Sequence, residues 1–122
     1  MLDKVKISID VMGGDNSPDK TLEGLNLFIK RNQNITDYIF YLFGDETIIN
    51  QKLSNYKYLK NNYKIFDTKI VVSNELSAMS SIKKGKNSSM WKAIQSQIDF
   101  SDDVTLSAGN TGVLLVMSKM IL

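Results

Sequence analysis

Strand-like and helix-like segments alternate along the whole chain, and this alternation limits the possible folds more than any other feature. Four segments read as strands: residues 4–12, 35–44, 68–73 and 102–107. Four read as helices: residues 17–32, 45–53, 88–100 and 113–122. Strands that alternate with helices predict a parallel sheet joined by right-handed crossovers. We therefore expect an α/β fold, with an open, mostly parallel, Rossmann-like sheet and helices on both faces.

The boundaries of these elements carry weaker signals. Ser17 is expected to cap the first helix, with Pro18 at its first helical position. Residues 74–87 show little periodicity and predict a short helix or a loop.

The last helix is apolar almost all round and reaches Leu122 without a Gly, Asn or basic cap. A helix of this kind is typical of the middle of a larger protein. Residues 1–122 contain no repeat and no linker. We therefore expect one α/β domain that is the truncated N-terminal part of a longer enzyme.

The residue types that are missing restrict the chemistry. The chain has no cysteine and no histidine, which removes thiolate nucleophiles, His-dependent triads and nearly all zinc or haem sites. A net charge of +2, from 15 basic and 13 acidic residues, gives no basis for nucleic-acid binding. No signal peptide and no run of membrane-spanning length is present, so a cytoplasmic location is expected.

Two glycine-containing turns follow predicted strands and are the main candidates for a binding site. The first is Gly13-Gly14-Asp15, and the second runs from Ser107 through Gly109, Asn110 and Thr111 to Gly112. Ligands of open parallel sheets bind beyond the carboxyl ends of the strands. Each turn also leads into a helix N-terminus, whose free N–H groups and dipole favour an anion.

Each turn also has a purely structural interpretation. Asn110 or Thr111 could cap the last helix, and Asp15 could be a turn residue. A purely structural interpretation fits Asp10 less well, because an acidic side chain at this end of a strand must be solvated, paired or functional. Neither turn has the spacing of a dinucleotide fingerprint or a P-loop. We expect no nucleotide cofactor, no other cofactor and no metal.

A third candidate is the basic segment that precedes the helix at 88–100. Lys83, Lys84 and Lys86 lie close in sequence to Ser88 and Ser89, which can cap that helix. Such a loop could hold phosphate or meet an acidic partner, although a solvated loop followed by a cap is the simpler interpretation.

These three segments, in this order, resemble the phosphate acyltransferase family of bacterial phospholipid synthesis. That family has a DxMGGD turn after its first strand, then a basic SSM segment, then a SAGNTG turn. The corresponding residues here are Asp10–Asp15, Ser88–Met90 and Ser107–Gly112. The resemblance covers essentially the whole chain but only about the first third of such an enzyme. It implies a sheet related to the phosphotransacetylase and isocitrate dehydrogenase type.

Two residues depart from the family pattern. Ala78 stands where the family usually has proline, and Lys83 stands in place of a typical arginine. Lysine keeps the charge but loses the bidentate geometry of a guanidinium group.

The resemblance implies transfer of a long-chain fatty acyl group from acyl carrier protein to inorganic phosphate, which gives acyl phosphate for phosphatidic acid synthesis. It implies Asn110, Thr111 and Asp10 as catalytic residues. It also implies a phosphate- or substrate-binding set: Gly13, Gly14, Asp15, Lys83, Ser88, Ser89, Ser107, Gly109 and Gly112.

The same resemblance implies several partners: acyl carrier protein, a second copy of the complete enzyme, the inner membrane surface and a downstream glycerol-3-phosphate acyltransferase. Two alternatives remain open from the residues. One is a related phosphate acyltransferase that uses acyl-CoA. The other is a non-catalytic or partner-dependent fragment.

Overall fold

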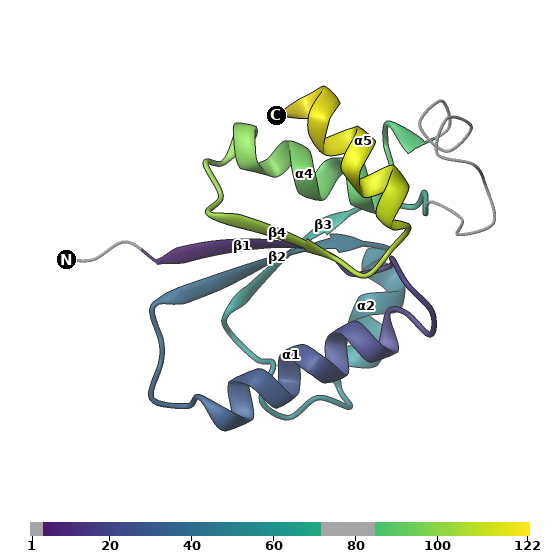
Figure 1. The fold of residues 1–122 in the computed structure, drawn as a ribbon. Coiled ribbons are helices and arrows are strands. Elements are labelled where there is room, and N and C mark those ends of the chain that lie inside the picture. The colour runs from purple at the N-terminus through teal and green to yellow at the C-terminus, as the bar shows by residue number, and fades with distance from the viewer. Residues whose placement is uncertain (1–3, 72–84) are drawn as a thin grey trace.

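Four parallel strands form a single sheet in the computed structural model, which describes residues 4–71 and 85–122 (Figure 1). The strands are β1 (Val5–Asp10), β2 (Tyr38–Gly44), β3 (Tyr63–Asp67) and β4 (Val104–Ser107). Their order in the sheet is β3-β2-β1-β4, and every neighbouring pair is parallel. The predicted α/β fold and parallel sheet are confirmed.

The helices cover both faces of this sheet, as expected. They are α1 (Asp19–Arg31), α2 (Glu46–Leu53), α4 (Ser89–Asp99) and α5 (Thr111–Ile121). Figure 1 shows α1 and α2 on one face and α4 and α5 on the other. The first two crossovers therefore step outward from β1 to β3, and the third returns over the opposite face to reach β4.

The main apolar core lies between the sheet and α1. Leu22, Leu25 and Ile29 of α1 are buried at helical spacing, and they pack in one cluster with Ile9 of β1 and Leu42 of β2. Complete burial of a side chain such as Leu22 is worth about 2 kcal/mol, so this stripe fixes α1 on the sheet.

The face under α4 is more polar. Ser8 of β1 is fully buried, and its hydroxyl donates to the Ala93 carbonyl at 2.8 Å and lies 2.7 Å from the Thr105 hydroxyl. Further along the same face, Phe43 and Phe66 stack with ring centroids 4.8 Å apart, and Phe100 lies 5.2 Å from Phe66. Helix α4 is thus held by hydroxyls on one side and by aromatic rings on the other.

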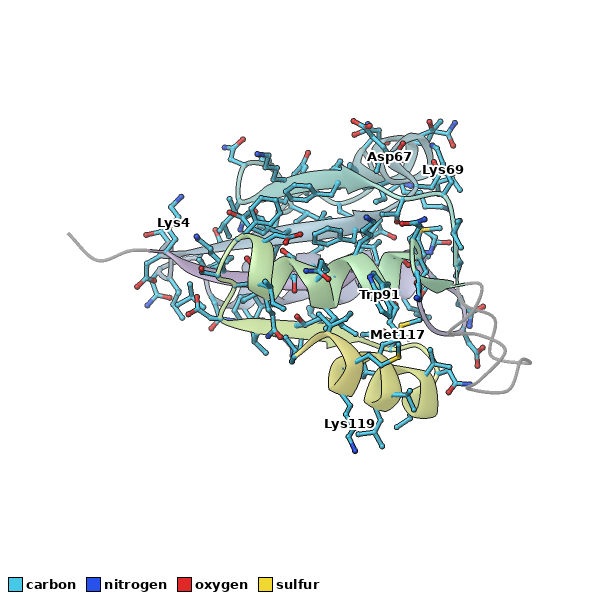
Figure 2. All side chains as sticks on the ribbon, turned by 90° about the horizontal axis from the view of Figure 1, so that it is seen from above. Lys4, Asp67, Lys69, Trp91, Met117 and Lys119 are labelled. Atoms are coloured by element: carbon cyan, nitrogen blue, oxygen red, sulfur yellow. The ribbon has the colours of Figure 1, made fainter. Side chains whose placement is uncertain are left out.

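Helix α5 packs on α4 through one side only. Met90 and Ile94 of α4 form a buried cluster with Val113 and Met117 of α5. In Figure 2, Met117 lies on the side of α5 toward Trp91 of α4, whereas Lys119 points away from the molecule. The opposite side of α5 is exposed and largely apolar.

Two predictions about element boundaries are wrong. The third strand is β3 (Tyr63–Asp67), because Tyr63 and Ile65 pack against the main core. Of the predicted residues 68–73, the described ones are 68–71, and they form only an isolated bridge from Ile70 to Ser88, with Ile70 and Val71 exposed. Ser17 does not cap α1, because its hydroxyl donates back to the Gly13 carbonyl and Pro18 occupies the N-cap position. Residues 74–84, where a helix or loop was expected, lie outside the described residues.

No helix in the described part of the chain combines the length and the apolar character needed to cross a membrane.

Candidate functional site

The carboxyl ends of β1 and β4 lie side by side and form the point where the direction of the fold reverses. Asp10 of β1 is paired in register with Ser107 of β4. The chain leaves β1 toward α1 on one face and leaves β4 toward α5 on the other (Figure 1). A crevice opens outside the sheet at such a switch point, and ligands of α/β proteins bind there.

The carboxylate of Asp10 is the polar centre of this switch point. Asp10 is only 2% exposed. Its Oδ1 accepts from the Ser89 hydroxyl at 2.5 Å and from the Gly13 N–H at 3.1 Å, and its Oδ2 accepts from the Ser107 hydroxyl at 2.8 Å. One buried side chain therefore ties together both glycine turns and the first turn of α4.

Burial raises the pKa of Asp10 above its ordinary value. The hydrogen bonds from Ser89, Ser107 and Gly13 act in the opposite direction, because they stabilise the carboxylate. The net shift of the pKa is upward, so the effect of burial on the carboxylate exceeds the effect of its hydrogen bonds.

The two glycine turns fit together because they lack side chains. A methyl group on Gly13 would collide with the Asp10 carboxylate and lie 3.1 Å from the Gly109 nitrogen. A methyl group on Gly14 would lie 2.8 Å from the Ala108 carbonyl oxygen, and Gly14 has a φ of 91°, which L-residues rarely adopt. The two turns therefore lie side by side across the sheet edge.

The N-terminus of α5 faces outward from this contact. Asn110 is the N-cap, and its Oδ1 accepts from the Val113 N–H at 3.1 Å. The capping interpretation is therefore correct for this oxygen. Its Nδ2 group, the Thr111 hydroxyl and the N–H groups of Thr111 and Gly112 have no hydrogen-bond partner within the described ranges. Among the residues that the structure describes, nothing competes with an anion for these donors.

The start of α4 lies against the same site. Ser88 caps α4 by accepting from the Trp91 N–H at 3.2 Å, as predicted. Ser89 is also buried, and its hydroxyl is committed to Asp10. Of the two serines predicted to bind phosphate, the structure thus shows one as a cap and the other as a support for Asp10.

The remaining predicted residues are less closely joined to this centre. Asp15 is exposed at the end of the first turn. Lys83 lies outside the described residues, and Lys86 is exposed shortly before α4.

A pocket of about 270 Å³ opens beside the two turns on the α1 face. Its lining combines apolar side chains with the polar residues Asp10, Ser107 and Thr21. A larger pocket of about 600 Å³ lies at the opposite edge of the sheet and includes none of the predicted site residues.

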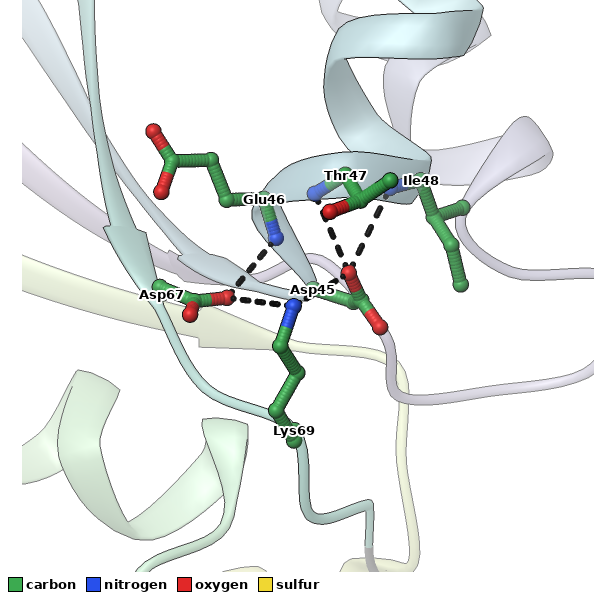
Figure 3. A network of polar contacts seen from close by, with 6 residues as sticks. All are labelled: Asp45, Glu46, Thr47, Ile48, Asp67 and Lys69. Atoms are coloured by element: carbon green, nitrogen blue, oxygen red, sulfur yellow. Dashed lines mark hydrogen bonds and ion pairs between the residues drawn. The ribbon is translucent and has the colours of Figure 1, made fainter.

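A second polar cluster on the same sheet edge was missed in the sequence. Lys69 bridges Asp45 and Asp67 at 2.9 and 3.2 Å, and Asp67 also accepts from the Glu46 N–H (Figure 3). Hydrogen bonds and the charge of Lys69 hold the pKa values of both carboxyl groups below their ordinary range. The sequence feature that could have revealed this cluster is an acidic residue at or just after the end of each of the first three strands.

Comparison with known proteins agrees with these motifs. A family described as "Fatty acid synthesis protein" matches residues 5–122. Relatives named phosphate acyltransferase include those of Pelagibacter ubique, 42% identical over 118 residues, and Azorhizobium caulinodans, 38% identical over 117 residues. Both alignments cover 95% of this chain, but only 33% and 32% of the respective relatives.

The chain therefore spans about one third of the length of these relatives, and the matched third includes both glycine turns and the start of α4. A match from β1 through to α5 covers every element that builds the candidate site. The chain belongs to the fatty acid synthesis protein family, whose relatives here are named phosphate acyltransferases.

Proposed function

We propose that this chain supplies the anion-binding part of a phosphate acyltransferase. The reaction is reversible transfer of a long-chain fatty acyl group from acyl carrier protein to inorganic phosphate, and its product is an acyl phosphate used for phosphatidic acid synthesis. Support comes from the family match and from one structural observation. The two glycine turns lock together at the switch point and leave the N-terminus of α5 open beside them.

The chemistry suits a site without histidine or cysteine. A phosphate oxygen attacks the thioester carbonyl and forms a tetrahedral oxyanion. The C–S bond then breaks, the thiolate leaves with the bonding electron pair, and the acyl phosphate remains. Phosphate is already an anionic nucleophile, so the protein has to position it and stabilise the oxyanion.

In this proposal the donors at the start of α5 carry the main role. Phosphate or the oxyanion is bound by Asn110 Nδ2, the Thr111 hydroxyl and the N–H groups of Thr111 and Gly112, which have no partner in residues 4–71 and 85–122. Gly109 allows the turn to pack against α4, because a methyl group there would lie 2.6 Å from the end of the Met90 side chain. In this proposal the 270 Å³ pocket on the α1 face, with its mixed apolar and polar lining, takes the acyl thioester.

Asp10 acts as a positioning residue. Both of its oxygens are occupied by Ser89, Ser107 and Gly13, so it orients the two turns and does not itself attack or bind phosphate. Asp15, exposed beside Gly14, borders the same crevice.

The proposed partners follow from charge and from the relatives. Acyl carrier protein is acidic, and Lys86 on the described part of the basic segment, with Lys83 before it, supplies complementary charge. Dimerisation of the complete enzyme, peripheral contact with the inner membrane and contact with a glycerol-3-phosphate acyltransferase belong to the same proposal.

Asn110→Asp gives a sharp test of the anion site. Aspartate keeps the capping oxygen, but it replaces the Nδ2 donor with a negative charge, so the helix stays capped while an anion is repelled. We expect phosphate affinity, measured by ³¹P NMR titration of the chain, to fall at least tenfold with no loss of thermal stability. Asn34→Asp, in the exposed loop before β2, is the control for added charge. Equal affinity in the two variants would contradict the assignment.

The acyl donor is tested in the chain joined to the rest of the Pelagibacter ubique relative. Acyl-phosphate formation is compared with a long-chain acyl-acyl carrier protein and with acyl-CoA donors. A higher kcat/KM with the carrier protein, together with a fall in this kcat/KM as the salt concentration rises, supports binding of the carrier protein to the basic segment before α4. Higher kcat/KM with acyl-CoA supports the related phosphate acyltransferase.

A partner-dependent fragment without activity of its own is the second candidate. The observation that favours it is the exposed apolar side of α5, because such surfaces mark contacts with other polypeptide. Activity of the chain alone would exclude it.

A further inference from the structure

The pocket of about 600 Å³ lies at the amino ends of β2 and β3, at the edge of the sheet opposite the two glycine turns. The acyl transfer proposed above does not use it. One wall comes from the end of α1 and the loop before β2, and the other comes from the connector between α2 and β3. Pockets that hold small organic molecules typically have volumes of roughly 300 to 1,000 Å³, so this pocket has room for such a ligand.

The connector wall of this pocket is held in place by its own contacts. Leu59 is only 3% exposed and anchors the connector in the main core. The Tyr58 N–H donates to Asn26 Oδ1 of α1 at 2.8 Å, and Asn62 Nδ2 donates to the Tyr38 hydroxyl at 3.0 Å. Packed and hydrogen-bonded residues therefore bound the pocket, and its shape does not depend on a loose loop.

The lining of the pocket carries positive charge only. Lys57 and Lys60, which flank Leu59, are its only charged residues. Both lysines are exposed, and neither forms an ion pair with a residue that the structure describes. Because lysine ammonium groups are common ligands of phosphate in proteins, the lining favours an anion and in particular a phosphate.

The rest of the lining suits a flat polar ring better than a hydrocarbon chain. Tyr38 and Tyr58 supply aromatic rings, and Ile29 and Ile35 supply apolar surface. The other side chains of the lining bear amide or hydroxyl groups: Gln33, Thr36, Asn61 and Asn62. An acyl tail would cover these polar groups without bonding to them, which costs free energy. A nucleobase, in contrast, stacks on aromatic rings and forms hydrogen bonds with amides through its edge.

We propose that this pocket binds a nucleoside phosphate. The phosphate lies at Lys57 and Lys60, and the base stacks on the ring of Tyr58. Gln33, beyond the end of α1, already donates from Nε2 to a backbone carbonyl at 3.1 Å, so its Oε1 is the atom left to accept from the base. Asn61, on the connector, offers the base both a donor and an acceptor.

Such a ligand would join the end of α1 to the connector across the pocket. It would bind separately from an anion at the N-terminus of α5, because that helix starts at the carboxyl edge of the sheet. The proposal goes beyond acyl transfer and does not depend on it, so binding alone tests it.

NMR titration of the ¹⁵N-labelled chain with AMP tests the site. We expect shifts in the amide signals of residues 33–38 and 57–62, and nuclear Overhauser effects between the base protons of AMP and the ring of Tyr58. Adenosine and inorganic phosphate should each bind in this pocket about tenfold more weakly than AMP, because each supplies only one part of the ligand. Shifts confined to residues 110–113 would place AMP at the start of α5 and overturn the proposal, and so would unchanged signals at residues 57–62.

Two lysine variants test the phosphate contacts. Lys57→Met and Lys60→Met remove the charge and keep a long side chain, so we expect the affinity for AMP to fall about three- to tenfold in each. Both residues are exposed, so the unfolding midpoint should hardly change. Lys119→Met, on the exposed side of α5, is the matched control. An equal loss of affinity in this control would contradict the assignment.

Two further ligands separate the possible sources of binding. Coenzyme A also contains a nucleoside phosphate, so tighter binding of coenzyme A than of AMP would assign the pocket to that cofactor. Equal or weaker binding would assign it to a free nucleotide, and either result supports a nucleoside phosphate. Decanoate is an anion with an acyl tail and no ring. If decanoate bound in the pocket as tightly as AMP, recognition of a base would be refuted.

Discussion

Replacing Asp10 with alanine should cost more stability than any other single change at the sheet edge. The substitution leaves three donors without their acceptor, namely the hydroxyls of Ser89 and Ser107 and the N–H of Gly13. A buried donor without a partner costs about 1 to 3 kcal/mol, and the burial penalty of the carboxylate, which raises its pKa, is recovered at the same time. We expect the unfolding free energy to fall by about 3 to 5 kcal/mol.

Urea denaturation followed by the fluorescence of Trp91 measures this change, because Trp91 is the only tryptophan and lies in the first turn of α4. Asp102→Ala is the control. Asp102 is also buried, but its one hydrogen-bond donor among the described residues is Ser96, so a loss of about 1 to 2 kcal/mol is expected.

A double-mutant cycle with Ser89→Ala locates the effect. The coupling between Asp10 and Ser89 should reach at least about 1 kcal/mol, because these side chains share a hydrogen bond. Two results would refute the role of Asp10 as the hydrogen-bonded centre of the site. One is a loss of unfolding free energy in Asp10→Ala no larger than that in Asp102→Ala. The other is a double variant whose loss equals the sum of the losses in Asp10→Ala and Ser89→Ala.

Five further outcomes are expected. Gly14→Ala should lower the melting temperature, because the methyl group meets Ala108 at a positive φ; Gly24→Ala, inside α1 with open space around it, should raise the unfolding free energy by about 0.5 to 1 kcal/mol. Asn110→Ala should cost about 1 kcal/mol in urea titrations, because it removes the cap of α5. Because the pKa of Asp10 is raised in the folded chain, part of the stability is lost as pH rises through that pKa, and Asp10→Asn should remove this slope from stability measured against pH. Lys69→Met should raise the pKa values of the two carboxyl groups that Lys69 bridges, as seen by NMR titration, and should lessen the stability lost when pH falls through them.

The sequence predicts the sheet and the meeting of the two glycine turns because both follow from general rules. Alternating elements imply parallel strands, and parallel strands bring Gly13-Gly14 and the turn after Ser107 to one edge. The hydrogen bond from Ser89 to Asp10 could not be predicted in this way. These residues are 79 positions apart, and the rotation of α4 on the sheet, which sets their contact, depends on the packing of Ser8 and the aromatic rings.

The wrong prediction of the third strand also arises from tertiary contacts that the sequence does not show. Ile70 and Val71 have strong β propensity but are exposed, whereas the true strand contains Lys64 and Asp67. Strand propensity mainly reflects burial against neighbours, and an edge strand buries only part of its surface. The signal of β3 is therefore weak in the sequence, and tertiary contacts decide its position.

The pairing of β1 with β4 also determines when the candidate site can form. Strand β1 can pair with β2 once the chain has reached Gly44, but Asp10 and Ser107 are 97 residues apart. During synthesis from the N-terminus, the Gly13-Gly14 turn therefore cannot form its final contacts until β4 and the start of α4 have been made. Until then the carboxyl group of Asp10 lacks the hydroxyls of Ser89 and Ser107, and one side of β1 has no neighbour. The anion site is thus a late product of folding, and the exposed side of β1 is the surface that a chaperone would meet on the nascent chain.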